Sequence, residues 1–356
     1  MKRFFLLFIL VVFSLTFSAC AKKDISKKKE VLGDGGVYKS SDGGETFFPI
    51  NKISEEKNLS GESVLDIVIN PQNPKVVYVG TKENGIFRSE NGGETWAESR
   101  SDFSYVKRIA LDPQDENVLY IVAESQGEMA LFKTTDGGIN WQRLLLPRDD
   151  NQPMVLDVYV DRQNPQIVYA TDSTNGIYKS TNGGLEWKAV YWGNFPAVAI
   201  LLDKFDDNIA YFITTGQEIY ITNDGGKNFY TARTDGPIYS ANASATEKGV
   251  FYVLYQGGLF VSRDAGHSFQ LLPTLLKPQE TVANIVVTDP IDKNIIYLVA
   301  GKVIYKTEDG GETWRAIPLK VKWRVSQFEI NPKNNSEIYL GLQKPIRRKM
   351  QIPFIR

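Results

Sequence analysis

Hydrophobic residues along most of this chain fall in short runs, and each run ends at glycine, proline, asparagine or aspartate. The stretch INPQNPKVVYVG, which begins at Ile69, places β-rich residues on both sides of a polar turn, and this pattern predicts an antiparallel hairpin. Similar stretches begin at Leu111, Val160, Leu202, Ser244, Thr288 and Ile330. Outside the N-terminus no window has a sustained helical period, so the pattern predicts an all-β protein.

A second motif alternates with these hairpins. SENGGETW, which begins at Ser89, is written seven times with small changes. Strand-like segments flank each copy, such as NGIYKS before STNGGLEW and KAVYW after it, so one repeat holds two hairpins and four strands. We call each copy a box; the third residues of the seven boxes are Asp42, Asn91, Asp136, Asn182, Asp224, Asp264 and Asp309.

The spacing of the boxes predicts a seven-bladed β-propeller. Successive third residues lie 49, 45, 46, 42, 40 and 45 positions apart, which is the period of a four-stranded propeller blade. The chain begins with a box hairpin and ends with a hairpin of the other kind, so neither end holds a whole blade. We therefore expect residues 325–342 to supply two inner strands and residues 35–50 two outer strands of one shared blade, which closes the ring.

The residue types of the box favour a structural role. Asp or Asn at the third position can accept backbone N–H groups within the turn, the glycine pair tolerates positive φ, and the final Trp or Phe fills the space beside the hairpin. Asn91 and Asn182 can form the same turn without a charge. The carboxylate is therefore not needed as an acid.

The amino-acid composition excludes several classes of ligand and catalytic site. The chain has 41 Lys plus Arg against 42 Asp plus Glu, so no global basic field attracts nucleic acid. His267 is the only histidine and lies inside a box, which excludes His-based triads and His-rich metal sites. We expect no cofactor, no metal and no catalytic residue set, although hydrolysis by two carboxylates stays open because carboxylates are plentiful.

The N-terminus predicts export and a lipid anchor. MKR precedes an apolar run of 14 residues that is too short for a comfortable membrane span, and FSAC ends at Cys20, the only cysteine. The segment resembles a bacterial lipoprotein signal, although Phe17 replaces the usual Leu. We predict a signal peptide at 1–19, lipidation of Cys20 and a flexible tether at 20–34, hence a membrane-anchored extracytoplasmic protein in the periplasm or at the cell surface. An ordinary signal peptide with a chance cysteine is the alternative.

With seven copies close to S-x-D-x-G-x-T-W, residues 33–342 resemble the Asp-box (BNR) repeat propellers. That superfamily includes sialidases, sortilin-type receptors, two-propeller xyloglucanases and photosystem II stability and assembly factors. The Arg-Ile-Pro start of sialidases is missing, and xyloglucanases place paired Asp residues in a cleft between two propellers. Size, blade count and export fit the assembly factors best, and the resemblance implies that the boxes lie away from the ligand face.

A ring of residues on the innermost strands is one candidate site. Counting twelve positions back from the last Tyr of each hairpin gives a set that is partly polar: Asp66, Arg108, Asp157, Ala199, Ser240, Ile285 and Gln327. The next position is apolar in every blade, which predicts a buried face between sheets. Asp66, Arg108 and Asp157 could bind a ligand in the channel or form an ion pair between neighbouring blades.

The second candidate is the face opposite the box turns, where loops lead into the innermost strands. Trp192, Lys322, Trp323 and Arg324 lie in such loops and combine aromatic and basic character, which suits a recognition surface. The alternative is that these Trp residues cover the ends of the blades. A basic tail, residues 343–356, follows the last predicted strand.

These patterns together predict a membrane-tethered propeller that binds a protein partner in or near the membrane and assists assembly or stability of a surface or membrane complex. The rival reading is a glycan-binding protein or glycoside hydrolase. An enzyme of that kind should show two carboxyl groups about 5 to 10 Å apart in an open pocket, whereas a binding module should show an exposed patch of aromatic and basic residues.

Overall fold

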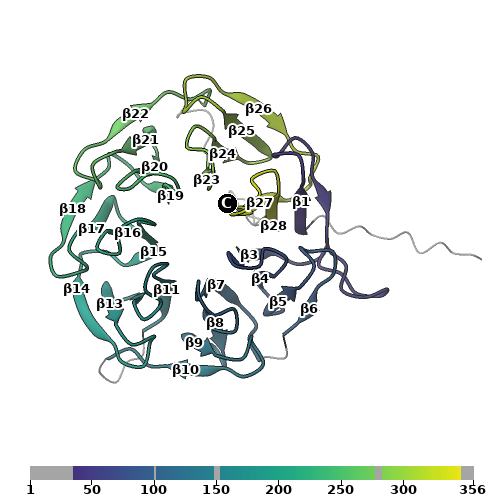
Figure 1. The fold of residues 1–356 in the computed structure, drawn as a ribbon, viewed down its shortest axis with the longest axis horizontal. Coiled ribbons are helices and arrows are strands. Elements are labelled where there is room, and N and C mark those ends of the chain that lie inside the picture. The colour runs from purple at the N-terminus through teal and green to yellow at the C-terminus, as the bar shows by residue number, and fades with distance from the viewer. Residues whose placement is uncertain (1–34, 100–101, 148–152, 277–282, 346–356) are drawn as a thin grey trace, which may run out of the picture. The chain divides into compact units, whose positions relative to one another are not determined.

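The computed structural model describes residues 35–99, 102–147, 153–276 and 283–345. The predicted signal peptide, Cys20, the tether and residues 346–356 of the basic tail lie outside the described residues. The described chain forms 28 strands arranged as seven four-stranded antiparallel sheets around a central axis (Figure 1). The prediction of an all-β, seven-bladed propeller is confirmed. No helix capable of crossing a membrane occurs in this part of the chain.

Six blades are built from consecutive strands, innermost strand first. The first three are β3 to β6 (Val64–Ile69, Val77–Thr81, Ile86–Ser89, Ala97–Glu98), β7 to β10 (Val106–Leu111, Leu119–Ser125, Glu128–Thr134, Gln142–Leu144) and β11 to β14 (Val155–Val160, Val168–Asp172, Gly176–Ser180, Lys188–Trp192). The next three are β15 to β18 (Ala197–Leu202, Ala210–Thr214, Glu218–Thr222, Tyr230–Arg233), β19 to β22 (Ile238–Ala243, Phe251–Tyr255, Gly258–Ser262, Gln270–Leu272) and β23 to β26 (Ile285–Thr288, Ile296–Ala300, Val303–Thr307, Arg315–Pro318).

The seventh blade joins the two ends of the propeller. Its strands are β27 (Arg324–Ile330), β28 (Ile338–Gln343), β1 (Gly36–Ser40) and β2 (Phe48–Pro49), in the order β2-β1-β28-β27. Strand β1 pairs with β28 over its whole length, with Val37 opposite Gly341. The Ser326 hydroxyl then donates to the carbonyl oxygen of Val64 in the first blade at 2.7 Å. The predicted closure by a shared blade is confirmed.

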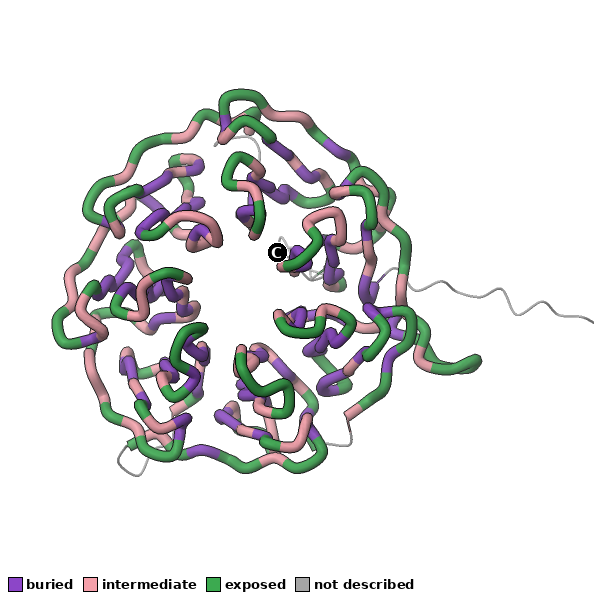
Figure 2. The backbone as a smooth tube through the Cα atoms, in the orientation of Figure 1, coloured by how far each residue is buried: buried purple, intermediate pink, exposed green. Residues whose placement is uncertain are grey.

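The hydrophobic core lies between adjacent sheets and follows the second strand of each blade. Strands β4, β12, β16 and β24 are buried at every position, whereas the connecting turns are exposed (Figure 2). The position after the channel ring is buried in six blades and half-buried at Ala241, as the alternation predicts. Neighbouring blades approach closely at Gly80, where a Cβ atom would lie 2.6 Å from the carbonyl oxygen of Val106. A larger residue there would push the first two blades apart.

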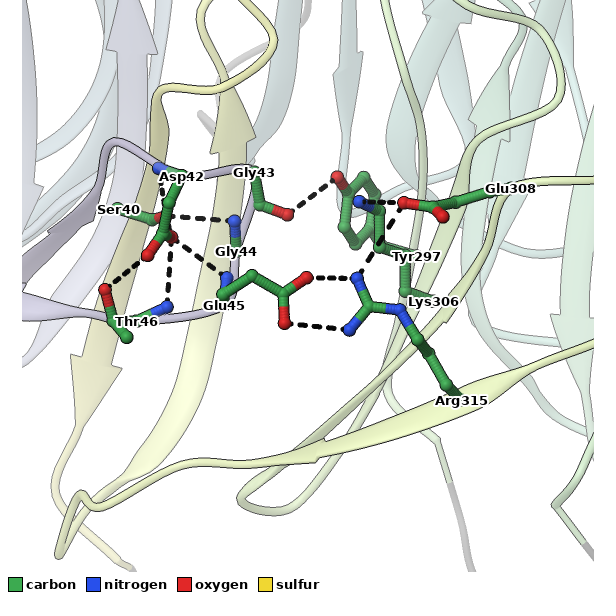
Figure 3. Close-up of polar contacts among 10 residues, drawn as sticks. All are labelled: Ser40, Asp42, Gly43, Gly44, Glu45, Thr46, Tyr297, Lys306, Glu308 and Arg315. Carbon is green, nitrogen blue, oxygen red and sulfur yellow. Dashed lines mark hydrogen bonds and ion pairs between the residues drawn. The ribbon is translucent and has the colours of Figure 1, made fainter.

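The box of the seventh blade shows how the repeated motif is built (Figure 3). The Asp42 Oδ1 atom accepts the backbone N–H groups of Glu45 and Thr46, each at 3.0 Å, and Oδ2 accepts the Thr46 hydroxyl at 2.5 Å. The Ser40 hydroxyl donates to Asp42 at 2.7 Å and accepts the amide of Gly44 at 2.9 Å. Gly43 and Gly44 have φ values of 73° and 92°, which the left-handed turn requires. Hydrogen bonds from Thr46 lower the pKa of Asp42 to about 2.

Asparagine makes the same turn without a charge. Asn91 Oδ1 accepts the Thr95 amide at 2.9 Å, and its Nδ2 donates to the Thr95 hydroxyl at 2.9 Å. Asn182 accepts the Glu186 amide in the same way. The box is thus a hydrogen-bonded turn in which the third residue acts as an acceptor.

Boxes also connect one blade to the next. The hydroxyl of Tyr297 in the sixth blade donates to the carbonyl oxygen of Gly43 at 3.3 Å, and Arg315 forms an ion pair with Glu45 beside it (Figure 3). Elsewhere Tyr120 donates to Gly183 at 2.7 Å and Tyr339 to Gly92 at 3.0 Å. These contacts fix three pairs of neighbouring blades against each other at the periphery of the ring.

Candidate functional site

The innermost strand of each blade faces the propeller axis; these strands are β3, β7, β11, β15, β19, β23 and β27 (Figure 1). Their side chains line a cavity of about 440 Å³. Its lining extends from the ring that contains Asp66, Arg108 and Asp157 to the turns that follow the innermost strands. Those turns are on the same face as the boxes, because box amides such as that of Gly92 donate to turn carbonyls such as that of Lys75, at 2.7 Å. We call the end of the cavity at these turns the channel mouth.

The structure brings Asp66, Arg108 and Asp157 together at the inner end of this cavity. The Nε atom of Arg108 lies 3.0 Å from Asp157 Oδ1, and its Nη1 atom lies 3.9 Å from Asp66 Oδ1. The two aspartates are only 3% and 2% exposed, respectively. Three neighbouring blades therefore share one group of charges.

These charges also hold backbone groups of adjacent blades. Asp66 Oδ2 accepts the Ile109 amide at 2.7 Å, and Asp157 Oδ2 accepts the Ile200 amide at 2.7 Å. Burial raises the pKa of Asp66 to about 6 against the opposing effect of Arg108, and burial also raises the pKa of Asp157. Because each carboxylate already has contacts at both oxygens, the arrangement is that of an ion pair joining blades.

Three charged residues that line the cavity nearer the channel mouth were not predicted as site residues: Arg162, Lys204 and Glu329. Burial raises the pKa of Glu329 to about 7, while burial and the neighbouring Arg162 lower the pKa of Lys204 to about 7. The sequence already distinguishes Arg162 and Lys204, because each stands at the third position of its hairpin motif, where the other repeats have no charge. The equivalent position of the other hairpins is Pro in four repeats and Ala in one, listed in chain order as Pro71, Pro113, Ala245, Pro290 and Pro332.

On the opposite face, the end of β14 and the loop after it expose two aromatic side chains; Trp192, expected in the loop, is the last residue of the strand. Trp192 is 54% exposed and meets the Tyr178 ring edge-on at 6.0 Å, and Phe195 is 41% exposed. The Tyr220 hydroxyl accepts the backbone amides of Asn194 and Phe195 at 2.8 and 2.9 Å. Segment 191–196 is thus an exposed aromatic loop with a fixed backbone, and we refer to it as the aromatic loop.

The other predicted loop residues lie at the closing blade. Trp323 is half-buried, packs with the hydrophobic core of that blade and lies directly over Gly35. Lys322 is exposed, and the Arg324 guanidinium donates to Gln343 Oε1 at 2.5 Å. Because Trp192 belongs to the third blade and Trp323 precedes β27, the two lie on opposite sides of the ring (Figure 1). The structure does not bring them together.

Among the described residues, no group of three or more His, Cys, Asp or Glu side chains is placed to hold a metal ion. The cavity offers charged and aliphatic side chains to a ligand, whereas the aromatic loop offers apolar rings.

Comparison with known proteins agrees with this architecture. The Sortilin-Vps10 family (Sortilin, neurotensin receptor 3) matches residues 35–176. A probable oligoxyloglucan-reducing end-specific xyloglucanase from Neosartorya fischeri is 29% identical over 149 residues, which are 37% of this chain and 17% of that protein. Sortilin from Danio rerio is 29% identical over 118 residues, 32% of this chain and 14% of that protein. The chain thus matches only a small part of these curated relatives.

Solved structures match over most of the propeller. The GH74 xyloglucanase from Xanthomonas campestris has a TM-score of 0.66 at 14% identity, covering 79% of this chain and 51% of that enzyme. YCF48 from Cyanidioschyzon merolae has a TM-score of 0.62 at 16% identity, covering 79% of this chain and 96% of YCF48. A structure described as YCF48 bound to D1 peptide has a TM-score of 0.61 at 14% identity, covering 81% of this chain and 94% of that one. At these identities the solved structures establish the fold alone. The family match and the sortilin relative bear out the predicted resemblance to sortilin-type propellers, and the Asp-box repeat is compatible with all of these matches.

Proposed function

We propose that this chain is a lipid-anchored extracytoplasmic propeller that binds another protein through the aromatic loop and assists assembly or stability of a surface or membrane complex. The observation that carries the proposal is the exposure of Trp192 and Phe195 on a backbone fixed by Tyr220. Coverage of nearly the whole of YCF48, one structure of which holds a D1 peptide, supports a protein ligand.

The physical reason lies in the entropy of binding. Exposed aromatic side chains supply much of the energy of protein interfaces, and residues already held in their bound conformation lose less conformational freedom on association. Two hydrogen bonds, from the backbone amides of Asn194 and Phe195 to the Tyr220 hydroxyl oxygen, hold the aromatic loop in place before a partner binds. The loop therefore suits a partner that offers an apolar pocket or strand.

Capture from detergent-solubilised membranes of the source cells tests the proposal. The immobilised propeller should retain a defined partner, and the double variant Trp192→Ala, Phe195→Ala should retain at least about tenfold less, since aromatic anchors each carry about 2 kcal/mol or more. Trp323→Ala is the matched control, because this half-buried Trp packs against its own blade. It should lower the melting temperature and leave capture by the folded fraction unchanged. Equal capture by the double variant and the wild type would refute the role of the loop.

The membrane anchor needs a separate test. Cys20→Ser should release the protein from the membrane fraction, because the apolar run that ends at FSAC would then carry no lipidated residue. A variant that fractionates with membranes as the wild type does would place the anchor elsewhere.

A second function rests on the similarity to xyloglucanases: a propeller that binds or cleaves a glycan. Asp66 lines the cavity, and a second carboxyl group, that of Asp157, lies on the other side of the Arg108 contact, with Oδ1 3.0 Å from Arg108 Nε. Incubation with xyloglucan oligosaccharides decides between the two functions. Release of new reducing ends by the wild type, lost in Asp157→Asn, would favour the enzyme, whereas the protein-binding proposal expects no release.

A further inference from the structure

The cavity on the propeller axis has chemically distinct zones. Its inner end is the charged ring, and its middle is lined by partly exposed aliphatic side chains, among them Val68, Leu201 and Val287. At the channel mouth stand Arg162 and Lys204, on neighbouring blades. A molecule that entered from this face would meet two cations first and an apolar wall behind them.

The two cations differ from other basic residues of the same face. Lys248 lies 2.7 Å from Asp206, and Lys293 lies 3.4 Å from Glu247, so each is neutralised by a carboxylate of the preceding blade. Within the described part of the chain, neither Arg162 nor Lys204 makes an ion pair, and the carboxyl group whose charge acts on both is that of Glu329. Arg162 lies beside the Tyr159 phenol, and both cations project into a space that a ligand can enter.

We propose that the channel mouth binds an amphiphilic carboxylate, a molecule whose single carboxylate lies between Arg162 and Lys204 and whose aliphatic body lies along the channel wall. This site is on the face opposite the aromatic loop and is independent of the function proposed above. It explains why two of the seven repeats replace Pro or Ala with a cation at one position.

The geometry matches this ligand class in charge and size. A guanidinium group binds carboxylate oxygens in a bidentate manner, and an ammonium group adds a point charge. A volume of about 440 Å³ accommodates a small organic acid. Burial and the charge of Arg162 lower the pKa of Lys204, and a carboxylate between the two would offset their mutual repulsion.

Glu329 makes the expected binding depend on pH. The charged or titratable groups that line the cavity are Asp66, Arg108, Tyr159, Arg162, Lys204 and Glu329, from five blades. The buried Asp289 of a sixth blade acts on Lys204. The pKa values of Glu329 and Lys204 are both shifted to about 7 and that of Asp66 to about 6. Each of these groups gains a proton as pH falls from 8 to 6, so the cavity becomes more positive. A carboxylate ligand such as octanoate, the eight-carbon fatty acid anion, stays ionised over this range. Binding should therefore tighten.

Titration calorimetry with octanoate, octanol and octylamine tests the site on the full chain. Octanoate should bind, and octanol and octylamine should bind at least about tenfold more weakly. The double variant Arg162→Ala, Lys204→Ala should weaken octanoate binding by at least about tenfold, because it removes both partners of the carboxylate. Lys248→Ala is the matched control, a lysine on the same face outside the cavity lining, and should bind octanoate as the wild type does.

Glu329→Gln distinguishes a specific site from a general attraction to basic surface. It should tighten octanoate binding at pH 8 and reduce its pH dependence, while the melting temperature shows that the variant is folded. Binding of octanol as tight as that of octanoate, unchanged affinity in the Arg162 and Lys204 double variant, or no octanoate binding by the wild type would each overturn the proposal.

Discussion

The boxes at the periphery and the ring around the channel are built from the same repeat, yet their aspartates have opposite properties. In the box of the second blade, Asp136 has its pKa lowered to about 2, because the Asn140 amide and other donors stabilise the charged form. In the ring, burial raises the pKa of Asp66 to about 6. The box aspartate is partly exposed and accepts hydrogen bonds from several donors, whereas the two ring aspartates are buried and share one guanidinium group.

The comparison teaches how to interpret a repeat protein. A position that is nearly the same in every repeat, such as the third residue of the box, performs the same structural task in each blade. A position that varies, such as that of Arg162 and Lys204, is free to carry chemistry of its own. The ring is intermediate, because its Asp, Arg and Asp are not repeated and still hold blades together.

The largest expected effect comes from removing the strands on which both regions depend. Deletion of residues 325–356 removes nearly all of β27 and the whole of β28. It leaves an open edge at β1 and takes away the strands that pack against β3 of the first blade. We expect loss of cooperative thermal unfolding, measured by circular dichroism. A truncated protein that melts as the full chain does would show that the two ends do not depend on each other.

Asp157→Ala should cost more stability than any single box substitution. It leaves Arg108 with only the more distant Asp66 and orphans the buried amide of Ile200. Removing one partner of a buried charge pair costs about 3 to 5 kcal/mol, which denaturant unfolding would measure. Asp157→Asn keeps an acceptor for the Ile200 amide and should lose less. Equal stability of the alanine variant and the wild type would mean that the ring does not hold the blades together.

Glu329 should give the stability a characteristic slope with pH. Its folded-state pKa, about 7, lies above its ordinary value of 4.5. Between pH 5 and 7 the folded protein thus holds a proton that the unfolded chain releases, and the free energy of unfolding should fall as pH rises. Glu329→Gln should reduce this slope, and the remainder should come from other carboxyl groups whose pKa burial raises, such as Asp66 and Asp157. A slope of the same size in the variant would assign it to other groups.

The smallest effect is expected for Asp136→Asn, because Asn91 and Asn182 already form the same turn. It should barely change the melting temperature at pH 7. The lowered pKa of Asp136 means that its contribution is complete above about pH 4 and is lost as pH falls towards 2. A large loss at pH 7 would show that the charge itself is required.

The sequence was sufficient for the fold because its information is local and repeated seven times. Hairpin turns, box spacing and the incomplete first and last repeats determined the blade count and the shared blade. The contact among Asp66, Arg108 and Asp157 was foreseeable for the same reason, since one position of the repeat places all three on one ring.

The candidate sites were harder to foresee because they depend on side-chain burial. Trp323 and Trp192 are both aromatic residues of loops on one face, but only the structure shows Trp323 packed over Gly35 and Trp192 exposed. Arg162 and Lys204 differ visibly from the repeat, yet their common cavity appears only when the ring is closed. The repeat predicts the features that all blades share, whereas the environment of residues that differ from the repeat is known only from the structure.

The most direct test of this account measures melting temperature and partner capture in parallel on two variants, Asp136→Ala and the double variant Trp192→Ala, Phe195→Ala. If repeated positions hold the fold and exceptional ones bind, the box variant melts at a lower temperature and its folded fraction captures the partner normally. The loop variant should melt as the wild type does and lose capture. The reverse pattern, a stable box variant that no longer binds or a loop variant that binds normally, would contradict the account.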